Sequence, residues 1–275
     1  MTKLVTWFTT RKMGWGKVII FAVLTAILTA VLNLIPALED TSFQDIAISF
    51  ECWILFAMYI IMNCEKWYEA MLKTFVFFLI SQPLIYLIEV PFNSMGFGLF
   101  QYYGHWFRIT LLTLPGSVIA FLVKRKSWLS VIVLSVADCM LAYLGAMYFW
   151  DMRWDFPHHL LSTVFCVLLA LFFIFALLDK KSHRAVAVII FAAALIIGLI
   201  VQKPDSVEEF DLPEGEWTYT VDNGSIADVN VSGDGHAVIK AKANGNDIIT
   251  FTDGENTIEY HVSVSGGGVY VSEIS

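Results

Sequence analysis

The chain has 275 residues, 57% of them hydrophobic, and its mean hydropathy of +0.68 lies above the range of soluble globular domains. The formal net charge of -8 conceals a division, because residues 1–202 contain 14 basic and 11 acidic side chains whereas residues 203–275 contain 3 and 14. Phosphates would repel this acidic C-terminal part, which argues against a nucleic-acid partner. The four cysteines form no CxxC pair and all precede residue 202, so we expect packed side chains rather than a disulfide framework.

Seven apolar segments lie in the first 202 residues. Each is close to the roughly 20 residues that a helix needs to cross about 30 Å of hydrocarbon. The first is too long for the apolar core of a signal peptide, so we expect it to be retained. The sequence therefore predicts an all-α membrane bundle of seven transmembrane helices over residues 1–202. The segments are residues 18–38, 46–63, 74–92, 106–123, 128–149, 158–178 and 185–201.

The loops between these segments alternate in charge. Basic residues precede the first segment and follow the second, fourth and sixth, whereas the other loops are acidic or nearly neutral. The positive-inside rule then places the N-terminus in the cytoplasm and the C-terminal part outside. Residues 1–17 mix apolar and basic side chains, and they form either a short interfacial helix or an ordinary flanking segment. The basic loop residues are Lys66, Lys73, Lys124, Arg125, Lys126, Lys180, Lys181 and Arg184.

The composition changes after residue 202 to short β-type runs separated by turn-forming pairs such as Asn223-Gly224 and Asp253-Gly254. Short alternating strands at this spacing are typical of a small all-β sandwich, and we assign residues 203–275 to it. A further strand near residues 205–212 has a weaker pattern. The predicted strands are residues 217–221, 226–231, 237–241, 248–252 and 257–264.

Three pieces of this region share a pattern of small and β-branched residues. They are Ile226-Ala227-Asp228-Val229, the stretch 235–241 (GHAVIKA) and the stretch 245–250 (GNDIIT), with Trp217 at an early-strand aromatic position. In these features residues 212–264 resemble the bacterial immunoglobulin-like (Big) domains, although Asp247 replaces a residue that is usually small. The resemblance implies an immunoglobulin-like spacer or adhesive module on a bacterial surface, without catalytic residues.

Several polar residues lie within the apolar segments, where a charge is costly and marks a functional site by default. Gln82, Tyr86 and Glu89 follow one another at helical spacing on a single face of the third segment. We expect them to line an outward-facing, ligand-binding pocket; the alternative is a set of interhelical hydrogen bonds with a buried Glu–Arg pair. The candidate ligand-binding residues are Glu51, Gln82, Tyr86, Glu89, Arg108, Asp138 and His159.

The arrangement predicts a multi-pass protein of a bacterial plasma membrane with a non-catalytic role at the cell surface. Its expected partners are the lipid bilayer, a cell-wall or surface ligand for the C-terminal domain, and another membrane protein. We expect no catalytic residue, no metal and no cofactor.

Two other functions remain open. The first is binding or uptake of a small molecule through the polar pocket. Ala22, Ala26 and Ala30 resemble the Ala-x-x-x-Ala face of the substrate-binding subunits of energy-coupling-factor transporters, although close packing of small residues gives the same spacing. The second is a membrane-embedded, metal-dependent hydrolase, against which the absence of an HExxH motif argues. Its candidate residues are Glu51, Glu89, Asp151, Asp155, His158 and His159.

Overall fold

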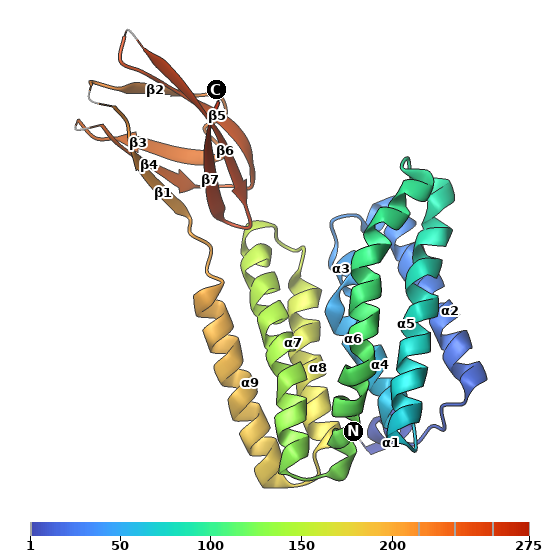
Figure 1. Ribbon diagram of the computed structural model, residues 1–275. Helices are drawn as coiled ribbons and strands as arrows, with labels where there is room; N and C mark the ends of the chain where they lie inside the picture. The colour runs from blue at the N-terminus through green and yellow to red at the C-terminus, as the bar shows by residue number, and fades with distance from the viewer. Residues whose placement is uncertain (1, 214, 234, 255, 275) are drawn as a thin grey trace. The chain divides into compact units, whose positions relative to one another are not determined.

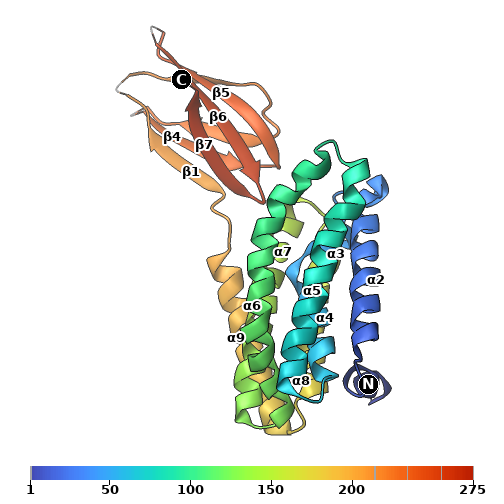
Figure 2. The same ribbon diagram turned by 45° about the vertical axis from the view of Figure 1, so that its right-hand side comes forward.

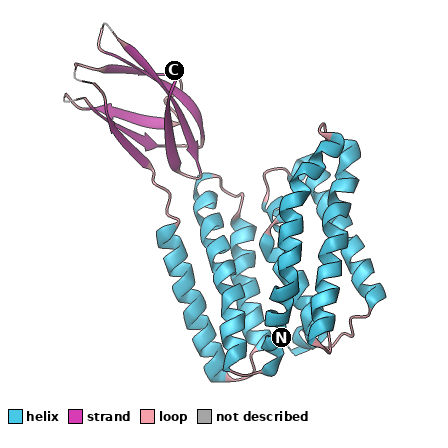
Figure 3. Ribbon diagram, in the orientation of Figure 1, coloured by secondary structure: helices cyan, strands magenta, loops and turns pink. Residues whose placement is uncertain are grey.

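The computed structural model describes residues 2–213, 215–233, 235–254 and 256–274. Helices occupy the chain as far as residue 201, and strands follow from residue 207 (Figure 3). The chain divides into two compact units. The helical unit comprises Met1–Gly145 and Leu161–Ile197, and the sheet unit comprises Ala146–Leu160 and Gly198–Ser275. Each unit is described by itself.

Seven helical segments in the described part of the chain are long and apolar enough to span a membrane, which agrees with the number predicted. The second of them consists of two helices, α3 and α4. The helices are α1 (Thr2–Thr9), α2 (Trp15–Leu34), α3 (Ser42–Ile48), α4 (Phe50–Met62), α5 (Trp67–Glu89), α6 (Tyr103–Phe121), α7 (Trp128–Trp154), α8 (Leu160–Leu177) and α9 (Lys181–Val201). Short 3-10 helices cover Pro36–Leu38, Val90–Phe92, Gly96–Tyr102 and Leu122–Arg125.

Two helix boundaries differ from the apolar segments of the sequence. Helix α5 begins at Trp67 rather than residue 74, because its charged first turns are stabilised by an ion pair of 3.1 Å between Lys73 and Glu69, one turn apart. The second span begins at Ser42 and is interrupted at Ser49, whose extended backbone (φ -87°, ψ 165°) separates α3 from α4. Hydropathy reports neither feature, since both depend on local pairing and backbone conformation.

Helices α2 and α5 lie side by side and run in the same direction (Figures 1 and 2). Near their N-terminal ends the Lys73 amine lies 5.8 Å from the centre of the Trp15 ring. Near their C-terminal ends Asn33 Nδ2 donates a hydrogen bond of 2.9 Å to Glu89 Oε1. The small-residue stripe of α2 is fully buried in the core of the helical unit, as expected for close helix packing. That stripe consists of Ala22, Ala26 and Ala30.

The N-terminal segment and the basic loops of the helical unit meet at one end. Asn63 Nδ2 donates to the carbonyl of Phe8, and Lys126 pairs with Asp179 at 2.7 Å. These contacts join segments that the positive-inside prediction places on the same side of a membrane. Further links are Lys12 to Glu65 and Lys124 to the carbonyl of Met62.

The strands of the sheet unit form two antiparallel sheets, one ordered β1-β4-β3 and the other β2-β5-β6-β7. Both contribute to one buried cluster, in which Ile239 and Phe251 are fully covered. The coarse prediction of an antiparallel β domain is confirmed. The strands are β1 (Val207–Asp211), β2 (Thr218–Val221), β3 (Ala227–Val231), β4 (His236–Ala241), β5 (Gly245–Thr252), β6 (Thr257–Ser265) and β7 (Gly268–Ile274).

Strand β7 was not predicted, and its hairpin explains why it forms. Gly266 and Gly267 connect β6 to β7 with positive φ values of 56° and 84°, as a tight type I′ hairpin requires. A Cβ atom on Gly267 would lie 1.9 Å from Nε1 of Trp154, at the end of α7 within the same unit. Only glycine therefore fits at this position.

Candidate ligand-binding site

Helices α2 and α5 each present polar side chains near their C-terminal ends. On α2 these are Thr29 and Asn33, one turn apart, and on α5 they are Gln82, Tyr86 and Glu89, which follow at intervals of four and three residues. Residues at this spacing share one face of a helix. Because the two helices are parallel neighbours joined by the hydrogen bond between Asn33 and Glu89, the two polar faces meet.

These side chains line a cavity of about 230 Å³, which we call the polar cavity. Trp53 of α4 and Trp106 of α6 supply aromatic walls. The complete lining is Thr29, Asn33, Trp53, Gln82, Ile85, Tyr86, Glu89 and Trp106.

Two polar atoms at this site are buried without a hydrogen bond to any part of the chain that the structure describes: Gln82 Nε2 and Asn33 Oδ1. Gln82 as a whole is only 4% exposed. Buried polar atoms in native proteins are nearly always paired, and leaving one unpaired costs roughly 1–3 kcal/mol. Glu89, the one charged residue in this lining, forms no ion pair with the described residues. The residues that line the cavity therefore include two with an unpaired amide atom and one with a carboxylate.

The structure brings together Gln82, Tyr86 and Glu89 of the predicted pocket, and it places the other candidates elsewhere. Glu51 is fully buried in the first turn of α4, where Oε1 accepts a hydrogen bond from the Ser49 hydroxyl. Asp138 of α7 is also fully buried, and neither oxygen has a hydrogen-bond partner among the described residues. Neither carboxylate lines the polar cavity.

Arg108 and His159 also lie apart from the polar cavity lining. The Arg108 side chain on α6 is exposed and forms no ion pair in the described part of the chain, so the alternative of a buried Glu–Arg pair is not realised there. His159 belongs to the sheet unit. Its backbone is left-handed (φ 61°), and its ring stacks at 3.6 Å on that of His158, whose Nδ1 lies 3.0 Å from Asp155 Oδ2.

Five lining residues were missed from the sequence: Thr29, Asn33, Trp53, Ile85 and Trp106. Thr29 and Asn33 carried a usable signal, because two polar residues one turn apart in an apolar helix mark a face turned towards protein. Trp106 is the first residue of its apolar segment, where a tryptophan is also expected at a membrane interface, so the sequence did not single it out.

A second cavity of about 350 Å³ lies among α4, α5, α6 and α7 in the helical unit, and we call it the apolar cavity. Most of its lining is hydrocarbon or aromatic, with Ile54, Phe78 and Leu112 as representatives. Trp53 and Trp106 line this cavity as well as the polar one. The two cavities therefore have the same pair of indole rings in their linings.

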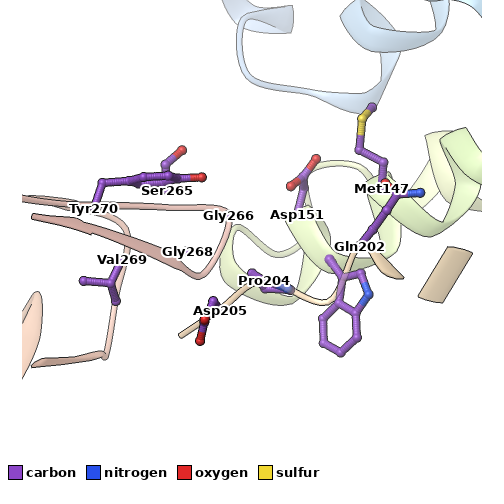
Figure 4. Close-up of a pocket in the computed structure, with 11 residues that line it drawn as sticks. Met147, Asp151, Gln202, Pro204, Asp205, Ser265, Gly266, Gly268, Val269 and Tyr270 are labelled. Atoms are coloured by element: carbon purple, nitrogen blue, oxygen red, sulfur yellow. The ribbon is translucent and has the colours of Figure 1, made fainter. Parts of the chain in front are cut away.

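The sheet unit contains a cavity of about 260 Å³ near the β6–β7 hairpin (Figure 4). Asp151 of α7, Asp205 and Tyr270 are among its lining. The surrounding contacts are structural, since Trp150 Nε1 donates to the carbonyl of Leu199 and the amide of Val269 donates to the carbonyl of Asp205.

The chain matches no family model, and no curated protein or solved structure is significantly similar to it. The resemblance of the C-terminal region to bacterial immunoglobulin-like domains thus remains a prediction. The function has to be argued from the site.

Proposed function

We propose that the helical unit binds a small organic cation in the polar cavity. The observation that carries the proposal is the pair of unpartnered buried atoms, Gln82 Nε2 and Asn33 Oδ1, in one cavity with the Glu89 carboxylate. A ligand with a hydrogen-bond acceptor and a charged donor group would satisfy all three. Pockets of this kind, mostly apolar with a few convergent polar groups, are the usual form of a small-molecule site.

The charge of the ligand follows from the charge of the cavity. An ionised carboxylate at membrane depth is costly unless a cation or hydrogen-bond donors offset it, and Asn33 supplies a single donor. An amine or ammonium group beside Glu89 would provide the missing positive charge. The rings of Trp53, Trp106 and Tyr86 would add cation–π attraction, which is strongest for tryptophan and for desolvated cations.

We place this site on the outer side of a bacterial plasma membrane. The positive-inside rule puts the N-terminus and the basic loops in the cytoplasm, so α2 and α5 run outward. The polar cavity lies near their outer ends because Asn33 and Glu89 are close to the last residues of those helices. A compound arriving from outside would meet this cavity first, which suits a role in recognition or uptake.

A second role, presentation of the sheet unit at the cell surface, is favoured by the two antiparallel sheets that share one core directly after the last span. We propose that residues 203–275 form an immunoglobulin-like sandwich outside the cell, facing a cell-wall or surface ligand. Its 14 acidic and 3 basic residues would keep it soluble and away from anionic lipids. The two roles are compatible in one protein.

The test uses the full-length protein in lipid nanodiscs with choline, ethanolamine and tetramethylammonium as probes, followed by calorimetry and tryptophan fluorescence. We expect saturable binding of at least one probe to the wild type and at least tenfold weaker binding to Glu89→Gln, which keeps an acceptor for Asn33 but removes the charge. Glu39→Gln, on an exposed residue outside the cavity, is the matched control. Absence of saturable binding, or binding that Glu89→Gln leaves unchanged, contradicts the proposal.

A further inference from the structure

The polar and apolar cavities have two walls in common. Trp53 and Trp106 line both, although they come from different helices, α4 and α6. Each indole also packs against an aromatic ring that lines the apolar cavity. Trp53 lies 5.7 Å from Phe78 and Trp106 lies 5.5 Å from Phe50, between ring centres. A ligand held between these indoles in the polar cavity therefore has the apolar cavity as its neighbour.

The two cavities are chemically opposite. The polar cavity holds a carboxylate and two unpartnered amide atoms, whereas the apolar cavity has no charged residue in its lining among the described residues. The few hydroxyls there include that of Thr113, which already donates to the carbonyl of Thr110 in its own helix. One cavity suits a charged head group and the other suits hydrocarbon, since apolar surface gains by leaving water.

We propose that the two cavities form one site for a single-chain cationic amphiphile. The amine or ammonium head binds Glu89 and Gln82, and the hydrocarbon chain passes the Trp53 and Trp106 rings into the apolar cavity. This inference rests on the proposed function and deepens it by naming the ligand class. The apolar cavity alone, at about 350 Å³, is near the lower end of the roughly 300–1,000 Å³ of ligand pockets, and the polar cavity shares two of its lining residues.

Two glycines of α6 provide a matched pair of variants for the chain-binding half of the site. Gly116 lines the apolar cavity, whereas Gly104, in the same helix, lines neither cavity. A Cβ atom on either glycine would meet nothing within 4 Å, so neither position has a clash at the first side-chain atom. Gly116→Leu fills part of the apolar cavity, and Gly104→Leu adds the same side chain outside it.

The experiment compares dodecyltrimethylammonium with tetramethylammonium, which has the head without the chain, in nanodiscs of one lipid composition. We expect Gly116→Leu to weaken binding of the dodecyl probe about tenfold or more and to leave tetramethylammonium unchanged. Gly104→Leu should affect neither probe, and Glu89→Gln should weaken both. Dodecyl sulfate, with the same chain and the opposite charge, should not bind saturably.

The outcomes separate the two proposals. If Gly116→Leu leaves the affinity for dodecyltrimethylammonium within twofold of the wild type while tetramethylammonium still depends on Glu89, the amphiphile inference is wrong and the proposed function stands. If neither probe depends on Glu89, both are wrong. Should Gly116→Leu fail to fold, Ala137→Leu fills the same cavity from α7 and replaces it in the comparison.

Discussion

Gln82 in the helical unit and Asp247 in the sheet unit are both 4% exposed, and each has one buried polar atom, Gln82 Nε2 and Asp247 Oδ2, without a hydrogen-bond partner among the described residues. Asp247 Oδ1 accepts hydrogen bonds from the backbone amides of Asn223 at 2.8 Å and Ile248 at 2.9 Å. Gln82 differs in that it lines the polar cavity. Burial alone therefore does not reveal the role of a polar residue. A side chain that accepts hydrogen bonds from nearby backbone amides stabilises the fold, whereas we propose that an unpaired side chain beside a cavity contacts a ligand.

The largest effect is expected at Gly267, where the backbone of the sheet unit leaves no room for a side chain. Gly267→Ala would place a Cβ atom within 1.9 Å of Trp154 Nε1 at a φ of 84°, and we expect a loss of about 3 kcal/mol or more in unfolding free energy. Urea denaturation of the full-length protein measures it. Gly224→Ala is the control, because nothing lies within 4 Å of its Cβ position. Equal stabilities for the two variants would contradict the close contact.

The second-largest effect is expected when the hydrogen-bond acceptor of two backbone amides is removed. We expect Asp247→Ala to destabilise the sheet unit by about 2 kcal/mol, because the amides of Asn223 and Ile248 would lose their acceptor. Asp247→Asn should recover part of the loss, since its side-chain oxygen can still accept. Glu259→Ala, at an exposed position of β6, should change the unfolding free energy by less than about 0.5 kcal/mol. If Glu259→Ala lowered the unfolding free energy as much as Asp247→Ala, the hydrogen bonds of Asp247 would not explain the effect.

Gln82→Leu should change the unfolding free energy in the opposite direction to Asp247→Ala. Replacing an unpartnered buried amide by hydrocarbon is expected to stabilise the helical unit by about 1 kcal/mol in the absence of ligand. The same variant should lose binding of the cationic probes. Thermal unfolding in nanodiscs, with and without choline, tests both the stability and the loss of binding. Gln101→Leu, on an exposed glutamine, is the control. A strongly destabilised Gln82→Leu would show that Gln82 holds the fold as Asp247 does.

The smallest effect concerns alkaline pH and is confined to the sheet unit. Burial raises the pKa of Tyr260 on β6, and the carboxylate of Glu273, its cross-strand neighbour on β7, raises it further. The folded state then holds this proton more tightly than the unfolded state. Its stabilising contribution is complete below the unfolded pKa of about 10 and is lost as pH rises through the folded value. The absorbance difference at 295 nm between wild type and Tyr260→Phe should titrate above pH 10, and a midpoint below 10 would be inconsistent with this account.

The sequence predicted the seven spans because each is a continuous apolar run, and it predicted the shared face of Gln82, Tyr86 and Glu89 because helical spacing fixes which residues lie together. It did not predict which helix that face meets, since the rotation and neighbours of a helix depend on packing. Asn33 was missed for this reason, and Arg108 was included although its side chain points away from the protein interior.

The remaining differences have local causes. The interruption at Ser49 lies within an apolar run that hydropathy treats as uniform. Strand β7 begins at the third of three consecutive glycines, whose conformational freedom obscures the alternation of Val269 and Val271 around Tyr270. In both places the backbone conformation, rather than the apolar pattern, decides the structure.

The lining of the polar cavity comes from a short part of the chain, between Thr29 and Trp106, and the apolar cavity extends it only to Met140. Ribosomes make proteins from the N-terminus, at roughly 5–20 residues per second. Every residue of the proposed site is therefore synthesised before the first strand of the sheet unit, which begins at Val207. During biosynthesis the residues of the proposed site are therefore complete before synthesis of the strands begins.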